Sequence, residues 1–322
     1  MGLAADRLMR EVPFVAATEA YRAELLQHCY RMLGSGADAE DLVQETYMRA
    51  WRGWAGFQGR SSVRVWLHRI ATNACLSALE GRPRRALPNG LGAPGDDPSQ
   101  PLPEDRDVLW VQPLPDPADV ATANASLRLA MIASLQQLPP RQRAVLILRD
   151  ALDWKTEEIA DALGTTVPAT RSILQRARAK LSEAPLDERD VVEPTEPEVR
   201  ALLDGYITAF EQADIHSLER VLRDDATLEG TKSKTWFSGK RTCLEFIGRS
   251  LHQPGAWRLI PTTANGQPAA AAYWHGTPYA IVVLTIARDG ITAMTVFTDT
   301  ALFPRFGLPA SAPPHPGLTN GD

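Results

Sequence analysis

Cysteine is scarce in this chain of 322 residues, which contains three. Cys29, Cys75 and Cys243 are far apart, and none belongs to a Cys and His spacing that suggests a metal site, so we expect plain core residues. The sequence also lacks an apolar run of transmembrane length, and its first residues lack the apolar segment of a secretion signal. These absences predict a cytoplasmic protein with no membrane partner, and nothing in the sequence indicates a metal or a cofactor.

A net positive charge, which is common among nucleic-acid-binding proteins, is lacking too, because the formal net charge is −5. The charge is distributed unevenly, however. Residues 14–85 hold ten basic and seven acidic residues, and residues 141–182 hold eight basic and five acidic ones. The spacers 86–125 and 183–200 each hold seven acidic residues, against one and two basic ones. Because the acidity lies largely in these spacers, the total charge does not argue against DNA binding.

A helix-turn-helix pattern occupies residues 139–181. Thr156 is placed to cap a short helix and Gly164 to end it. Thr166 is placed to cap a second helix, whose first turn tolerates Pro168 because the amides there have no partner inside the helix. The residues expected on the buried stripe of this second helix are Thr170, Leu174, Ala177 and Leu181.

The second helix also has a basic side. No acidic residue occurs between Ala162 and Ser182. The residues on this side and its flank are Arg171, Gln175, Arg176, Arg178 and Lys180. Such a helix suits contact with phosphates and base edges, whereas the alternative is an ordinary helical hairpin whose basic face is solvated.

Two further helices are predicted near the N-terminus. The first covers residues 19–33 and ends at Gly34, and the second starts at Asp38, which is placed to cap it. The residues that share a polar face of the second helix are Asp41, Gln44 and Glu45. Taken alone, such a face is more often solvated than a docking surface.

A loop over residues 57–62 precedes a third helix, over residues 63–79, which Ser61 or Ser62 is placed to cap. The residues that share one side of this helix are Trp66, Ile70, Asn73 and Ser77, with Arg64, His68 and Arg69 close by. An aromatic side chain and polar groups around a loop suit an unstacked single-stranded base.

The segments DAEDLVQETYMRAW, FQGRSSVRVWLHRIATNACL and LPPRQRAVLILRDALDWKTEEIADALGTTVPATRSILQRARAKL occur in this order, with an acidic Pro-rich spacer before the third. Together they resemble the extracytoplasmic-function (ECF) sigma factors of bacterial RNA polymerase, which belong to the sigma-70 family. The resemblance implies two all-α sigma domains, helical region 2 and helix-turn-helix region 4. It also implies two partners, promoter DNA and the clamp helices and flap of core RNA polymerase.

The resemblance assigns roles to residues at matching positions. Those implied to bind core polymerase are Asp41, Leu42, Gln44 and Glu45. Those implied to contact the −10 element are Phe57, Arg60, Ser61, Trp66, Arg69 and Asn73. Those implied to contact the −35 element are Thr166, Arg171, Gln175, Arg176 and Arg178. Many relatives have other residue types where this chain has Val167 and Pro168, so the promoter sequence stays open.

The spacer over residues 81–125 is rich in Pro and acid and would not fold alone, so its plainest role is that of a tether. In the sigma family the corresponding linker threads near the polymerase active centre, which implies that Trp110 is an anchoring point along that path. Residues 126–138 read as one more amphipathic helix, expected to pack under the helix-turn-helix.

From residue 198 to residue 303 three helices are followed by several strands, which predicts an α+β domain. The order resembles the SnoaL-like roll, shared with ketosteroid isomerases, which implies a conical pocket. Residues that can face such a pocket are Tyr206, Trp236, Tyr273, His275 and Asp299. No paired acid and base can be identified from spacing, and a lone His275 or Asp299 is more often structural, so we favour a regulatory role over catalysis.

The sequence therefore predicts a multidomain chain with no enzymatic activity of its own. Its expected domains are region 2 (14–82), an acidic Pro-rich linker (83–125), region 4 (126–184), a second acidic linker (185–197), a SnoaL-like α+β roll (198–307) and a disordered tail (308–322). We expect a sigma factor that directs promoter-specific initiation, with a small ligand or an anti-sigma protein as a candidate further partner. The alternative is a SnoaL-like isomerase or cyclase with an N-terminal DNA-binding module.

Overall fold

The computed structural model describes residues 14–116, 127–183 and 196–313. The chain divides into two compact units, the first made of Met1–Arg85 and Ala130–Pro185 and the second of Ala86–Leu129 and Leu186–Asp322. Most of the predicted linker 185–197 and the last nine residues of the predicted tail lie outside the described residues. No helix in the described ranges is both long and apolar enough to cross a membrane.

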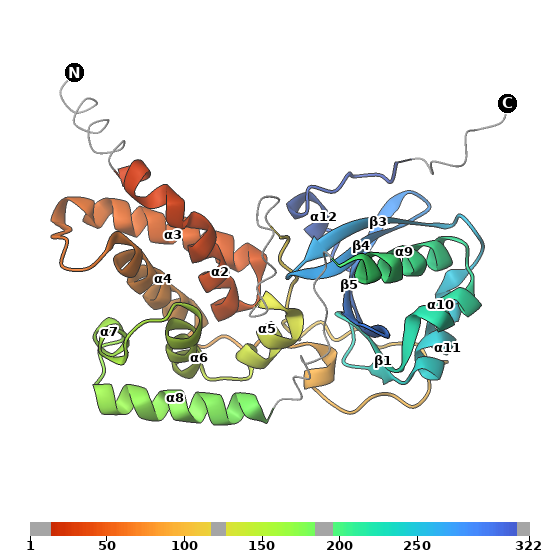
Figure 1. Ribbon diagram of the computed structural model, residues 1–322, viewed down its shortest axis with the longest axis horizontal. Helices are drawn as coiled ribbons and strands as arrows, with labels where there is room; N and C mark the ends of the chain where they lie inside the picture. Colours follow the sequence, from red (N-terminus) through yellow and green to blue (C-terminus); the bar gives the residue numbers. More distant parts are fainter. Residues whose placement is uncertain (1–13, 117–126, 184–195, 314–322) are drawn as a thin grey trace, which may run out of the picture. The chain divides into compact units, whose positions relative to one another are not determined.

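The first unit is entirely helical (Figure 1). Its helices are α2 (Arg22–Leu33), α3 (Gly36–Gly53), α4 (Val63–Leu79), α5 (Leu129–Gln136), α6 (Pro140–Leu146), α7 (Thr156–Ala162) and α8 (Val167–Ser182). Helices α2, α3 and α4 pack on one another, and α6 and α7 both pack against α8. A π-helical turn over Ile147–Ala151 follows α6. The all-α fold predicted for this part of the chain is confirmed.

Helix boundaries in this unit follow local capping rules, with two corrections. Ser35, not Asp38, caps α3, because its hydroxyl accepts the Asp38 N–H and Asp38 lies in the first turn. Thr156 is the first residue of α7 rather than its cap; the Glu158 carboxylate accepts the Lys155 N–H (2.8 Å).

Three predicted boundaries agree with the structure. Ser62 caps α4 by accepting the Val65 N–H (3.2 Å), and Thr166 caps α8 by accepting the Ala169 N–H (3.3 Å). Gly34 follows α2 with a φ of 66°, a left-handed conformation that glycine adopts without strain.

Arg143 holds the first unit together from inside. Its side chain is 3 % exposed. It donates to the carbonyl oxygens of Met32 at the end of α2 and of Leu135, Gln136 and Leu138 around α5. Burial lowers its pKa to about 10, so the guanidinium stays charged at neutral pH and all these bonds are charge-assisted. Arg143 is therefore a structural residue, although it is one of the basic residues of the helix-turn-helix segment.

The second unit is an α+β roll, as predicted (Figure 1). Its helices are α9 (Pro197–Glu211), α10 (Ile215–Val221), α11 (Lys240–Leu251) and α12 (Leu302–Arg305). Its strands are β1 (Leu222–Gly230), β2 (Trp236–Ser238), β3 (Trp257–Ala264), β4 (Gln267–Trp274), β5 (Thr277–Ala287) and β6 (Gly290–Phe297). They form one sheet in the order β2-β1-β6-β5-β4-β3, in which only the β1 and β6 pair is parallel. Apolar residues of α9, α10 and α11 pack with one face of this sheet in a single core.

The turn between β3 and β4 has two residues, Asn265 and Gly266, with φ values of 60° and 66°. Ala264 pairs with Gln267 on either side of it. A two-residue hairpin turn requires positive φ at both positions, and Asn-Gly is the pair that adopts it most readily. The turn therefore holds the Asn265 side chain in a fixed position, where it forms hydrogen bonds with Leu114 and Leu127.

Residues 86–116 of the predicted tether belong to the second unit. Near its start the Asn89 N–H donates to the carboxyl of Glu229 (3.1 Å), and the Trp236 indole N–H donates to the Gly92 carbonyl (2.9 Å). Arg249 donates to the Pro98 carbonyl (2.6 Å). Although residues 86–116 contain no long helix or strand, they lie against the roll at successive points.

Two stronger attachments follow. The Asp105 N–H donates to the Lys232 carbonyl (2.8 Å), and the Asp105 carboxylate accepts the Lys234 N–H (2.7 Å) and pairs with its ammonium group (2.9 Å). Further on, Leu114 and Asn265 exchange two hydrogen bonds: the Leu114 N–H donates to the Asn265 amide oxygen, and the Asn265 N–H donates to the Leu114 carbonyl (both 2.9 Å).

Asn265 and Gly266 complete this last attachment. The Asn265 amide nitrogen donates to the Leu127 carbonyl (2.6 Å), and the Gly266 N–H donates to the Asp116 carboxylate (2.8 Å). Asn265 is 1 % exposed, so these bonds are shielded from water. The linker that the sequence presents as a tether is thus fastened to the roll.

Candidate nucleic-acid interface

A pocket of about 620 Å³ lies between the loop after α3 and helix α4. All six residues implied to contact the −10 element line it, together with Asp161: they are Phe57, Arg60, Ser61, Trp66, Arg69 and Asn73. Phe57 and Trp66 are half-buried, whereas Arg60, Ser61, Arg69 and Asn73 are exposed. The pocket therefore combines aromatic faces with hydrogen-bonding groups, which is the composition that recognises an unstacked base.

Local packing fixes the aromatic part of the pocket. The rings of Trp54 and Phe57 stack with centroids 5.7 Å apart and an interplanar angle of 9°. The Phe57 and Trp66 rings lie 4.8 Å apart at 36°. Because Ser62 caps α4, Trp66 lies one turn into this helix, and Arg69 and Asn73 follow on the same side.

Asp161 of α7 is the pocket residue that sequence reasoning missed. Its carboxylate forms an ion pair with the Arg69 guanidinium at 3.0 Å. An acidic side chain from the helix-turn-helix thus pairs with Arg69 inside the pocket. Asp161 is separated from Arg69 by 92 residues in the chain, so no local pattern could have revealed the contact.

The basic side of α8 is accessible. Its exposed residues include those implied to contact the −35 element, namely Thr166, Arg171, Gln175, Arg176 and Arg178. Arg178 differs from the others because the Asp150 carboxylate pairs with it at 2.5 Å. Thr170 and Ala177 are buried on the opposite side, as predicted.

The polar face of α3 lies on the surface. Asp41 and Gln44 are exposed, and Leu42 and Glu45 are half-buried. Glu45 pairs with Arg49 at 2.7 Å. Met48, whose side chain is 48 % exposed, lies one turn beyond Gln44 and Glu45 on the same face and was not predicted. An exposed methionine among acidic residues suits a protein partner.

Comparisons with known proteins agree with this geometry. The family model described as Sigma-70 region 2 matches residues 18–85, and the model described as Sigma-70, region 4 matches residues 128–181. The ECF RNA polymerase sigma factor SigG of Mycobacterium tuberculosis is 50% identical over 316 residues, which cover 94% of this chain and 85% of SigG. The chain belongs to the ECF sigma factors. It is therefore a transcription initiation factor of the sigma-70 family, which works with RNA polymerase. Sigma factors are transcription regulators and not enzymes.

Two more relatives extend the similarity of this sigma factor across both units. The probable ECF sigma factor SigI of Mycobacterium tuberculosis is 28% identical over 290 residues, covering 89% of this chain and 93% of SigI. The crystal structure of the Mycobacterium tuberculosis ECF sigma factor SigJ matches with a TM-score of 0.60 and 24% identity, covering 92% of this chain and 99% of SigJ. The second match supports the fold, including the C-terminal roll. Nothing in these comparisons favours the alternative of an isomerase or cyclase.

The five residues proposed for a pocket in the roll do not gather in one place. Tyr206 is buried in the core, and the Tyr273 hydroxyl donates to the Pro309 carbonyl (2.8 Å). His275 is exposed in the turn after β4, and Asp299 accepts the Ala301 N–H (3.0 Å). Trp236, as described above, bonds to the linker. None of them lines the cavity of about 240 Å³ in the roll, so their role as pocket residues stays a prediction.

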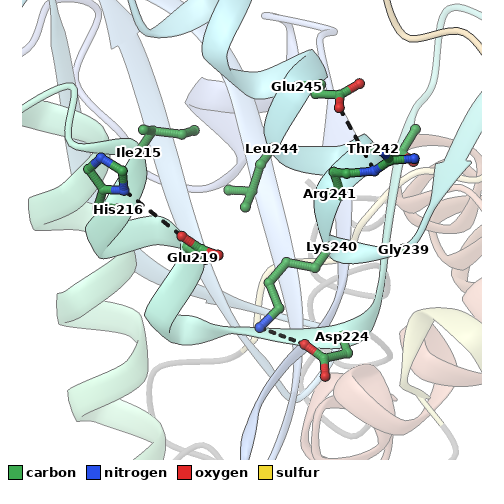
Figure 2. Close-up of a pocket in the computed structure, with 10 residues that line it drawn as sticks. All are labelled: Ile215, His216, Glu219, Asp224, Gly239, Lys240, Arg241, Thr242, Leu244 and Glu245. Carbon is green, nitrogen blue, oxygen red and sulfur yellow. Dashed lines mark ion pairs between the residues drawn. The ribbon is translucent and has the colours of Figure 1, made fainter.

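A larger surface cleft of about 690 Å³ lies between α10 and the start of α11 (Figure 2). Its charged residues pair with one another: Lys240 with Asp224 at 2.7 Å, Arg241 with Glu245 at 4.0 Å, and His216 close to Glu219 at 3.9 Å (Figure 2). Lys240 and Arg241 are each paired with a carboxylate, so the described residues of the cleft offer no unpaired cation that would attract an anionic ligand.

Proposed function

We propose that this sigma factor reads the −10 element with the pocket around Trp66 and the −35 element with the exposed side of α8. It binds core polymerase through the α3 face that carries Asp41. The observation that carries the proposal is the convergence of all six implied −10 residues on one pocket. The proposal requires the protein to act in the cytoplasm, where RNA polymerase works. An anti-sigma protein stays a predicted partner.

In this proposal the structure shows the first unit in a form that is not bound to a promoter, because Arg69 of α4 is paired with Asp161 of α7. The −10 and −35 elements are separated by more than one turn of duplex DNA, whereas here α4 and α7 are joined by a 3.0 Å contact. Val65 of α4 also packs on the helix-turn-helix core that contains Trp154 and Ile159. Region 4 must therefore leave α4 before both elements are read.

The C-terminal roll restrains the linker in this proposal. The family resemblance implies that the linker threads into polymerase, and residues fastened to the roll at Asn89, Asp105 and Leu114 cannot also follow that path. Release of these attachments is then a step in forming the holoenzyme. The roll acts as a brake on initiation.

Replacing Asn265 with glycine should raise promoter-directed transcription. Glycine keeps the positive φ of the turn but loses the side chain that bonds to Leu114 and Leu127, at a cost to docking of about 1–3 kcal/mol per unsatisfied group. Run-off transcription with purified core polymerase, limiting sigma factor and the chain's own upstream DNA should give roughly tenfold more transcript or above.

His252→Gly is the matched control, because His252 also has a positive φ (52°) and is exposed at the end of α11. It should transcribe like the unmodified protein. Equal or lower transcript from Asn265→Gly than from His252→Gly would rule out a brake.

Stability of the roll should fall as pH rises, because of Glu229. Its carboxyl, 6 % exposed, bonds to Asn89 and to the hydroxyl of Thr295 (3.1 Å each), and burial raises its pKa to about 7 from the ordinary 4.5. The folded unit thus keeps a proton that the unfolded chain releases near pH 4.5. Stabilisation by this group is present at low pH and is lost as pH rises through about 7, by about 3 kcal/mol in all.

Glu229→Gln imitates the protonated carboxyl and should remove this contribution. Urea unfolding of the full chain at pH 5.5 and pH 8.5 should show a smaller loss of stability for Glu229→Gln than for the unmodified protein. An identical pH dependence in both would contradict a buried protonated Glu229.

A further inference from the structure

The cavity of about 240 Å³ in the roll has one wall that does not come from the roll. Leu102, Pro103 and Glu104 of the linker line it. The rest of the lining comes mainly from β1, β2, β5, β6 and α11 and from the loop over residues 231–235. Leu102 also packs against the apolar core of the second unit. The cavity is therefore complete only while the linker is docked.

The wall of the cavity is mainly apolar. Side chains that define it are Leu228, Phe237, Phe246 and Val296. Thr298 also lines it, and its buried hydroxyl makes no hydrogen bond within the described residues. That hydroxyl is closed off from any space of water size, so a molecule in the cavity meets the apolar wall rather than this group.

Three charged side chains line the cavity: Lys232 is exposed to solvent, and the two acidic ones have partners elsewhere. The Glu229 carboxyl bonds to Asn89 and Thr295, and the Glu104 carboxylate pairs with Arg106 at 3.1 Å. A cavity of this size exceeds the volume of about 150 Å³ that holds benzene in an engineered protein core. Its contents are thus limited to the size of one or two rings.

We propose that this cavity binds a small, uncharged, largely apolar molecule, and that its binding strengthens the hold of the roll on the linker. The coupling rests on the proposed function of the roll as a brake. Since the linker supplies one wall, a ligand makes more contacts with the docked form than with the released form. A ligand shifts an equilibrium towards the form that it binds better, so an occupied cavity lowers transcription.

The test uses 2-naphthol, which is uncharged at pH 7, as the probe and 2-naphthoate as its charged counterpart. Calorimetric titration of the full chain should show saturable 2-naphthol binding with a Kd on the order of 10⁻⁴ M and weaker binding of 2-naphthoate. Val296→Phe, which fills the cavity, should abolish binding, whereas Val296→Ala, which enlarges it, should retain it.

Equal binding to Val296→Phe and the unmodified protein, no saturable binding, or preference for 2-naphthoate would overturn the site. Coupling has its own readout: Asn265→Gly should bind 2-naphthol several-fold more weakly, and 2-naphthol should reduce run-off transcript from the unmodified protein but not from Val296→Phe. Unchanged affinity in Asn265→Gly would overturn the coupling. The brake itself is judged separately, by transcription from Asn265→Gly without any probe.

Discussion

Promoter-directed transcription should fall by about ten- to a hundredfold when Trp66 is replaced by alanine. Stacking of one base on an aromatic side chain contributes about 1–3 kcal/mol. Trp66 also supports Phe57, whose ring lies 4.8 Å away, so its removal disturbs both aromatic faces of the pocket. Run-off transcription with core polymerase and the chain's own upstream DNA measures the loss directly.

Trp51→Ala is the matched control for this experiment. Trp51 is a half-buried tryptophan of α3 whose ring contacts Phe14 at 5.4 Å, and it does not line the pocket. It should transcribe far better than Trp66→Ala, provided that both variants have helical circular dichroism like that of the unmodified protein. Equal activity of the two variants would show that Trp66 does not read the promoter.

Replacing Arg143 with methionine should destabilise the first unit by about 3 kcal/mol or more. Methionine fills a similar space but donates no hydrogen bond, so the carbonyls of Met32, Leu135 and Leu138 lose their donor inside the protein. Urea unfolding followed by helical circular dichroism should show an early transition for the first unit.

Arg141→Met provides the comparison within the same helix. Arg141 is exposed two residues before Arg143, so its replacement should change the unfolding free energy by less than about 0.5 kcal/mol. If both variants unfolded at the same urea concentration, Arg143 would not be the tie between α2 and α5.

The sequence predicts those parts of the structure that depend on local signals. Ser62 and Thr166 cap their helices as expected, and Asn73 comes together with Phe57 because loop and helix are adjacent in the chain. Apolar segments bounded by Gly and Pro predict β3 to β6, but not β1 and β2. The first of these contains the exposed Asp224 and Asp225, and the second has only three residues.

Tertiary contacts account for the rest. Nothing local distinguishes the buried Arg143 from the exposed Arg141, or marks Asp161 as the partner of Arg69. The linker composition correctly indicates a segment that cannot fold alone, but the roll supplies the hydrogen bonds that this segment lacks. The Asn265-Gly266 turn is visible in the sequence, whereas its attachment to Leu114 is not, because 151 residues separate the two.

Hydrogen exchange at the turn between β3 and β4 tests the account most directly. In the free protein the Asn265 and Gly266 amides are bonded to Leu114 and Asp116 of the linker and should exchange slowly. Binding of core RNA polymerase should release the linker and speed exchange at these two amides, while amides between β4 and β5 stay protected. Unchanged slow exchange at Asn265 and Gly266 in the holoenzyme would show that the linker remains docked, and would contradict control of initiation through its release.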